Sequence, residues 1–271
     1  MKRPGLAGIL YGINITMGVI LSIPIFIAFA AAISDSGFSP EMAEQFDIGL
    51  WADMLEETGP IFQILMGQLI WMIPLIYIWK VASSVAVVHA VQGSGEGSFW
   101  QGVGQHTGRA LLLGLPFVGM ALTLLIAVVI LVTILGFLLT GEVVQFWIRF
   151  VFTPIILFIG LAFVDMMHDF ARIELVVGKK KIMESWFAGV TWFLHSGTAH
   201  AVYLGWLAIG LVTMILPLWA NVAVGGLFLA FLLQQTLLFI RSMVTVGWIA
   251  SEVMLYEDLV DEDVEVDEDA L

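Results

Sequence analysis

Histidines are the residues of this sequence best suited to bind a metal or a haem, and four of them form two pairs in similar contexts. His89 corresponds to His168, and His106 corresponds to His195. Two imidazoles from different helices can ligate haem iron axially, and an imidazole with a carboxylate such as Asp165 can bind a divalent metal. The alternative is that a repeated architecture places the same amphipathic residue in the same interfacial environment. No HExxH or comparable spacing is present, so we expect no cofactor and keep the four histidines as candidate haem or metal ligands.

Polar side chains inside apolar segments form a second candidate site, because charge within a membrane is costly and is usually paired or functional. Gln234, Arg241 and Glu252 share one face of a predicted helix. Such a face can line a translocation pathway, or it can make structural contacts between helices. We favour structural contacts and expect Arg241 to pair with Asp165 or Glu252. The full set of candidates is Arg149, Asp165, Asp169, Arg172, Gln234, Arg241 and Glu252.

These residues belong to an unusually apolar chain. Of its 271 residues, 60% are hydrophobic and 12% are charged, whereas an ordinary soluble domain is roughly 45–50% apolar and 25% charged. A formal net charge of −13 argues against a nucleic-acid partner. The absence of cysteine excludes disulfides and iron–sulfur clusters. The composition therefore predicts a polytopic membrane protein and excludes a soluble enzyme.

Six apolar segments predict an all-α bundle of six membrane-spanning helices within residues 1–256, because each is long enough to cross a ~30 Å hydrocarbon core. They cover approximately residues 6–33, 61–91, 110–140, 143–168, 198–224 and 225–256. Residues 39–57 predict an amphipathic helix on the outer surface. Residues 257–271 are strongly acidic and predict a disordered cytoplasmic tail.

The positions of lysine and arginine predict the orientation of the bundle. Eight of the ten basic residues fall at the N-terminus, the second loop or the fourth connection, which lie on the same side. The loop at residues 34–60, on the other side, holds seven acidic residues and no basic one. The positive-inside rule therefore predicts that both termini are cytoplasmic.

An internal similarity predicts a repeat. Ser98–Val103 (SFWQGV) reappears as Ser185–Val190 (SWFAGV), and each stretch is followed by one of the paired histidines. Each unit contains a span with a proline, an interfacial helix and the next span, and both units begin on the same side. We therefore expect residues 61–140 to superpose on residues 143–224 by a rotation about the membrane normal.

Two stretches, Phe163–Ile173 and Gln235–Tyr256, carry a resemblance to a known group of proteins. The chain resembles uncharacterised six-span bacterial integral membrane proteins related to the membrane domain of glycerophosphodiester phosphodiesterase. In that group an aspartate-x-x-arginine turn ends the fourth span, and Asp169 and Arg172 match it here. The resemblance implies a location in the bacterial cytoplasmic membrane and an architecture without a known activity. The phosphodiesterase catalytic domain is absent from the sequence.

Together these patterns predict a non-catalytic integral membrane protein that acts as a scaffold, an accessory subunit or a lipid-interacting component. Its expected partners are membrane lipids, other membrane subunits or a second copy of the chain, and no nucleic acid. A transporter or permease that uses the polar faces of spans four and six is the alternative, and a haem- or metal-binding protein is third. We expect no enzyme, because the sequence has no nucleophile–base pair, phosphate loop or metalloprotease motif.

Overall fold

The computed structural model describes residues 4–35, 59–92, 98–223 and 227–269. Within these ranges the chain is all-α and contains no strand. The predicted all-α fold is confirmed, and six of the described helical segments are long and apolar enough to cross a membrane. The amphipathic helix expected at residues 39–57 lies outside the described part of the chain.

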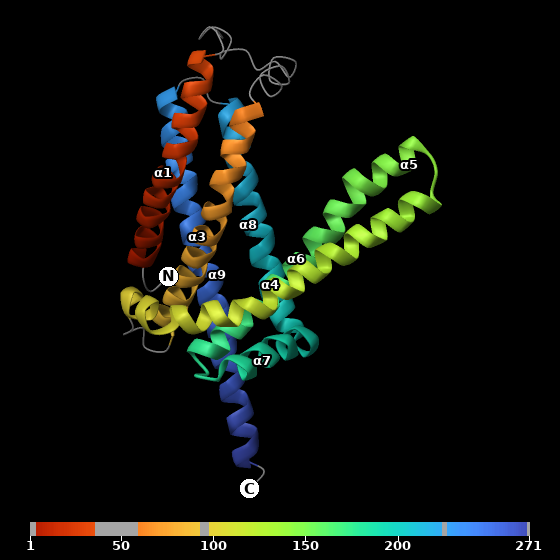
Figure 1. Cartoon of the computed structure of the whole chain (residues 1–271). Coiled ribbons are helices and arrows are strands. Elements are labelled where there is room, and N and C mark those ends of the chain that lie inside the picture. The colour runs from red at the N-terminus through yellow and green to blue at the C-terminus, as the bar shows by residue number, and fades with distance from the viewer. Residues whose placement is uncertain (1–3, 36–58, 93–97, 224–226, 270–271) are drawn as a thin grey trace. The chain divides into compact units, whose positions relative to one another are not determined.

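The helices form two compact units, which are described separately: residues 8–80, and residues 1–7 with 81–271. In chain order (Figure 1) the elements are α1 (Pro4–Asp35), α3 (Gly59–Val91), α4 (Phe99–Leu138), α5 (Glu142–Phe146), the π-helix η2 (Trp147–Phe152), α6 (Thr153–Val176), α7 (Ile182–His195), α8 (Gly197–Ala223) and α9 (Leu227–Asp269). Within the smaller unit, α1 and α3 are joined where Trp79 Nε1 donates a hydrogen bond to Asn14 Oδ1 at 3.0 Å.

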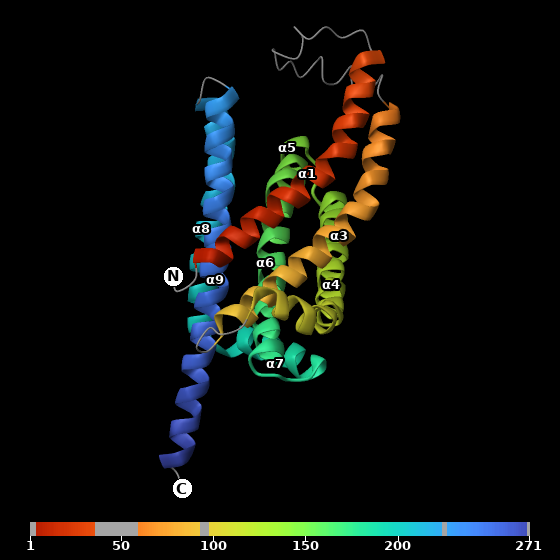
Figure 2. The ribbon, with the colours of Figure 1, turned by 90° about the vertical axis from the view of Figure 1, so that its left-hand side faces the viewer.

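The core of the larger unit lies at the end where α7 crosses the bundle, which we call the α7 end (Figure 1). Residues 81–90 of α3 are almost all buried there, and so are nearly all residues from Met166 to Val176 of α6. The α6 helix packs against α4, α7 and α9. The α8 and α9 helices lie side by side (Figures 1 and 2). The α7 end is therefore the part of the unit in which side chains from several helices meet.

Away from the α7 end, the second half of α4 forms a hairpin with η2 and the first half of α6. Figure 1 shows the tip of this hairpin diverging from α8 and α9. Most of its large apolar side chains are exposed, among them Phe137 and Phe150. Gln145 closes the turn by donating to the carbonyl oxygens of Gly136 and Leu139, both at 2.8 Å. These apolar faces suit contact with lipid chains or with another membrane protein.

The π-helix η2 has a local cause in the proline that follows it. Pro154 has no N–H, and its ring would clash with the carbonyl of residue 150 in a regular α-helix. The wider π turn relieves this clash, and the hydroxyl of Thr153 donates to the Ile148 carbonyl at 2.7 Å. The span predicted at residues 143–168 is therefore built from α5, η2 and α6 and continues to Val176.

One predicted boundary is corrected by the structure. The interfacial helix expected before span three is not separate, because α4 runs without a break from Phe99 to Leu138. In the second half of the repeat, by contrast, Ser196 separates α7 from α8 and caps α8 by accepting a hydrogen bond from the Ala199 N–H at 3.2 Å.

The acidic segment from residue 257 lies at the end of α9, which extends to Asp269; its predicted disorder stays a prediction. No glycine or proline follows Gly247, so nothing in the backbone stops the helix. Extending a helix that is already anchored needs no new nucleation, which offsets part of the repulsion among the acidic side chains.

Candidate functional site

The last three turns of α6 carry most of the charged side chains buried at the α7 end. Asp165, Asp169, Arg172 and Glu174 all project from this segment, and each has a partner. We call these four residues and their partners from other elements the α6 network; the partners are Ser84, Lys180, Trp192, Tyr203 and Tyr256.

Arg172 joins α6 to the end of α3. Its guanidinium pairs with Asp169 one turn earlier on α6, and its Nη1 donates a hydrogen bond to Ser84 Oγ at 2.6 Å. Arg172 and Asp169 are both buried. The planar guanidinium can serve both partners because its donors point in different directions. The predicted shared face of Asp169 and Arg172 is confirmed, and the structure adds the contact across helices.

Asp165 joins α6 to α8. The buried Tyr203 hydroxyl of α8 donates to Asp165 Oδ2 at 3.2 Å. Tyr203 packs edge-on against Trp248 of α9, with ring centroids 5.1 Å apart. Trp248 Nε1 in turn donates to Glu252 Oε1 at 2.7 Å, so this buried carboxylate has its donor on its own helix. Polar contacts at the α7 end thus link α6 to α3 and α8, and the Tyr203–Trp248 ring contact links α8 to α9.

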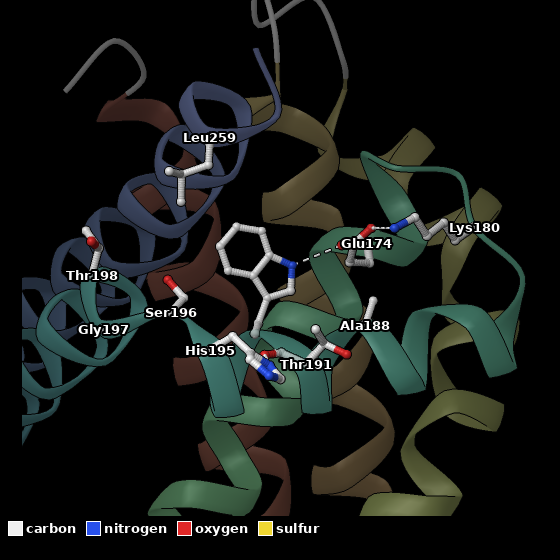
Figure 3. Close-up of a pocket in the computed structure, with 10 residues that line it drawn as sticks. Glu174, Lys180, Ala188, Thr191, His195, Ser196, Gly197, Thr198 and Leu259 are labelled. Atoms are coloured by element: carbon white, nitrogen blue, oxygen red, sulfur yellow. Dashed lines mark hydrogen bonds and ion pairs between the residues drawn. The ribbon is translucent and has the colours of Figure 1, made fainter. Parts of the chain in front are cut away.

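Glu174 accepts from three donors, although it is not among the residues predicted from the sequence. Trp192 Nε1 of α7 donates to Oε1 at 3.0 Å, and the Tyr256 hydroxyl of α9 donates to Oε2 at 3.1 Å. Lys180 Nζ lies 2.9 Å from Oε2 (Figure 3). A single carboxylate that is 3% exposed therefore connects α6 with α7, α9 and the turn between α6 and α7.

The histidines do not converge on one site. His106 Nε2 lies 3.3 Å from His89 Nδ1, so these two rings meet across a hydrogen bond rather than across a haem. His168 packs against Phe117, with ring centroids 4.8 Å apart, and His195 is exposed. Among the residues that the structure describes, no group of three or more His, Asp and Glu side chains is placed to hold a metal ion.

The expected pairing of Arg241 with Asp165 or Glu252 is wrong. Arg241 is exposed on α9 and forms no ion pair with any described residue. Glu252 lies eleven residues further along the same helix, about 16 Å away along its axis. Both expected carboxylates instead accept hydrogen bonds from aromatic side chains. Gln234 is half-buried on α9, and Arg149 is exposed on η2, in the diverging hairpin.

The two sequence copies of the repeat make equivalent close contacts through their glycines. A Cβ atom at Gly102 of α4 would lie 2.8 Å from both Ala86 Cα and His89 Cβ of α3. A Cβ atom at Gly189 of α7 would overlap the Met167 carbonyl of α6. Both glycines therefore allow their helix to approach the preceding one closely. The superposition of residues 61–140 on 143–224 stays a prediction, because residues 61–80 belong to the smaller unit.

Replacing Gly189 with alanine is expected to lower the free energy of unfolding by about 1–3 kcal/mol, because overpacking forces α7 away from α6. Gly104→Ala is the matched control, since a Cβ atom there has nothing within 4 Å. This control should be neutral or stabilising by up to about 1 kcal/mol. Thermal unfolding of the purified protein measures both changes, and equal effects would contradict the close contact.

Comparisons of the chain with protein-family models, with curated proteins and with solved structures find no match. The α6 network is therefore the main structural guide to function. Its buried side chains already form hydrogen bonds and ion pairs with other residues of the protein, which bears on whether they can act on a substrate.

Proposed function

We propose that this chain is a non-catalytic integral membrane protein, a scaffold in which polar side chains of the spans hold the helices together. The observation that carries this proposal is the arrangement around Glu174, where donors from α7, from α9 and from the α6–α7 turn meet on one buried carboxylate. A general acid or base must reach the proton that it transfers in a substrate. Glu174 is only 3% exposed and its two oxygens already accept from Trp192, Tyr256 and Lys180, which suits a structural role.

The proposed scaffold lies in a bacterial cytoplasmic membrane with both termini in the cytoplasm. The distribution of basic residues supports this orientation, and Lys179, Lys180 and Lys181 in the α6–α7 turn would then face the anionic inner leaflet. The exposed apolar hairpin of α4 and α6 supports contact with membrane lipids, with other membrane subunits or with a second copy of the chain. The bacterial origin follows from the resemblance to uncharacterised six-span proteins and stays a prediction.

A permease is the alternative that one observation favours, namely an exposed Arg241 without an acidic partner among the described residues. In a permease, Arg241 and Gln234 would line a water-filled path near the middle of the membrane. In a scaffold, the Arg241 position faces lipid and water does not reach it from either side.

Cysteine labelling separates the two functions, since the chain has no native cysteine. The scaffold predicts that a membrane-impermeant maleimide does not label Arg241→Cys in cells or in inverted vesicles, because a thiolate does not form in hydrocarbon. Labelling from either side would instead support the permease. Ser36→Cys and Ser94→Cys serve as controls and should label from opposite sides; labelling from the same side would refute the predicted topology.

A further inference from the structure

A pocket of about 780 Å³ opens at the α7 end, beside the α6 network (Figure 3). The end of α6, the α6–α7 turn, α7, the start of α8 and α9 all contribute to its wall. This volume lies within the range of small-molecule sites, which is roughly 300–1,000 Å³. The lining residues that matter for its chemistry are Glu174, Lys180, His195, Ser196, Thr198 and Leu259.

Lys180 supplies a cation that is held in position at this pocket. Its backbone N–H donates to the Glu174 carbonyl at 3.2 Å, and its own carbonyl accepts a hydrogen bond from Arg109 at 2.8 Å. The Lys180 side chain is 44% exposed. An ammonium has three N–H donors, and the ion pair with Glu174 occupies one side of it. The remaining donors are available to a ligand in the pocket.

The other polar groups of the pocket also favour an anionic ligand. Glu174 lines the wall, but its negative charge is compensated by three donors, so it opposes an anion only weakly. Thr198 is exposed in the first turn of α8 and carries a hydroxyl donor. The Ala199 N–H of this turn is already capped by Ser196 Oγ, but this end of the helix dipole is positive and attracts an anion.

We propose that this pocket binds the phosphate group of a phospholipid headgroup, with Lys180 as the cation that contacts it. The pocket lies at the end of α6 and the start of α8, two membrane-spanning helices, and headgroups occupy this level of a bilayer. Lys179 and Lys181 flank Lys180 and add attraction for an anionic surface. Soluble phosphate compounds share the same chemistry and are the alternative source of the ligand.

A phosphodiester suits the pocket better than a phosphomonoester. Glu174 lines the pocket beside Lys180, so its wall carries a negative charge as well as a positive one. A phosphodiester bears one negative charge, whereas a phosphomonoester bears about 1.5 to 2 at neutral pH. Phosphatidylglycerol is therefore a suitable probe. The scaffold role does not depend on this site, because a protein that folds normally but binds no lipid would still be a scaffold.

Native mass spectrometry of the full chain in detergent can measure binding of phosphatidylglycerol, of a diacylglycerol with the same acyl chains, and of inorganic phosphate. We expect Lys180→Gln to weaken phosphatidylglycerol binding about tenfold, since a hydrogen bond to a charged group is lost. Lys181→Gln removes the same charge one residue later, from a side chain that is 88% exposed and does not line the pocket. This control should change binding less than about twofold, and Lys180→Arg, which keeps the charge, should retain most of the binding.

Equal weakening by Lys180→Gln and Lys181→Gln would overturn the proposal, because the effect would then follow net charge alone. Diacylglycerol binding as tight as phosphatidylglycerol would also overturn it. If inorganic phosphate competes at concentrations similar to those of the lipid, the phosphate site is supported and its ligand is a soluble phosphate compound. If only the lipid binds, the ligand is the phospholipid headgroup.

If Lys180→Gln does not fold, Thr198→Val tests the same wall of the pocket and should weaken phosphatidylglycerol binding about threefold. Unchanged binding by Thr198→Val would count against the site.

Discussion

Replacing Arg172 with methionine is expected to lower the free energy of unfolding of this protein by about 3 kcal/mol. The substitution keeps much of the side chain's volume but removes the guanidinium that pairs with Asp169 and donates to Ser84. Asp169 would then be a buried carboxylate without its cation, and α3 would lose its polar contact with α6. Reversible unfolding in mixed micelles, followed by tryptophan fluorescence, measures the change.

Arg241→Met provides the matched control. It makes the same substitution in another membrane-spanning helix, at an arginine that is exposed and has no ion pair with a described residue. It should not lower the stability, because this arginine has no ion pair to lose and a charge that faces lipid is itself costly. If the two variants lose the same stability, the burial and pairing of Arg172 do not matter, and the α6 network is not what holds α3 against α6.

Glu174→Gln is expected to have the second-largest effect, lowering the free energy of unfolding by about 2 kcal/mol. Glutamine has nearly the same shape, but its amide nitrogen would face a donor, either Tyr256 or Trp192, and Lys180 would lose its counter-charge. The same unfolding measurement applies.

Glu184→Gln is the control for the Glu174 variant. Glu184 also pairs with a lysine of the α6–α7 turn, but its side chain is 56% exposed and lies 4.0 Å from Lys181 Nζ. An exposed pair of this kind contributes about 0–1 kcal/mol. A loss at Glu184 as large as that at Glu174 would show that the turn is stabilised by surface charge rather than by the buried carboxylate.

The spans were predictable from the sequence because the bilayer sets their length and composition, whatever the neighbouring helices are. Helical periodicity also placed Asp169 and Arg172 on one face, as the structure has them. Periodicity describes one helix at a time, however, and cannot show which side chain of another helix reaches that face. For this reason Ser84 and Tyr203 were not identified as partners, and Arg241 was assigned carboxylates that have other donors.

Glu174 shows the same limit most clearly. It lies two residues after Arg172 at the end of an apolar run and before three lysines, so its sequence context resembles that of a solvated acid at a membrane surface. Its burial depends on α7 folding back across the end of α6, a step that the close contact at Gly189 allows. An acidic residue that lies between a membrane span and a following amphipathic helix can therefore be buried, because that helix can fold back over it.

The central claim, that α6 holds the other helices through polar contacts at the α7 end, is tested most directly by a double-mutant cycle between Glu174→Gln and Tyr256→Phe. These side chains lie on α6 and α9 and are joined by one hydrogen bond of 3.1 Å. We expect a coupling energy of about 1–2 kcal/mol, as found for residues in direct contact. Additive effects of the two substitutions, with a coupling energy below about 0.3 kcal/mol, would contradict the claim.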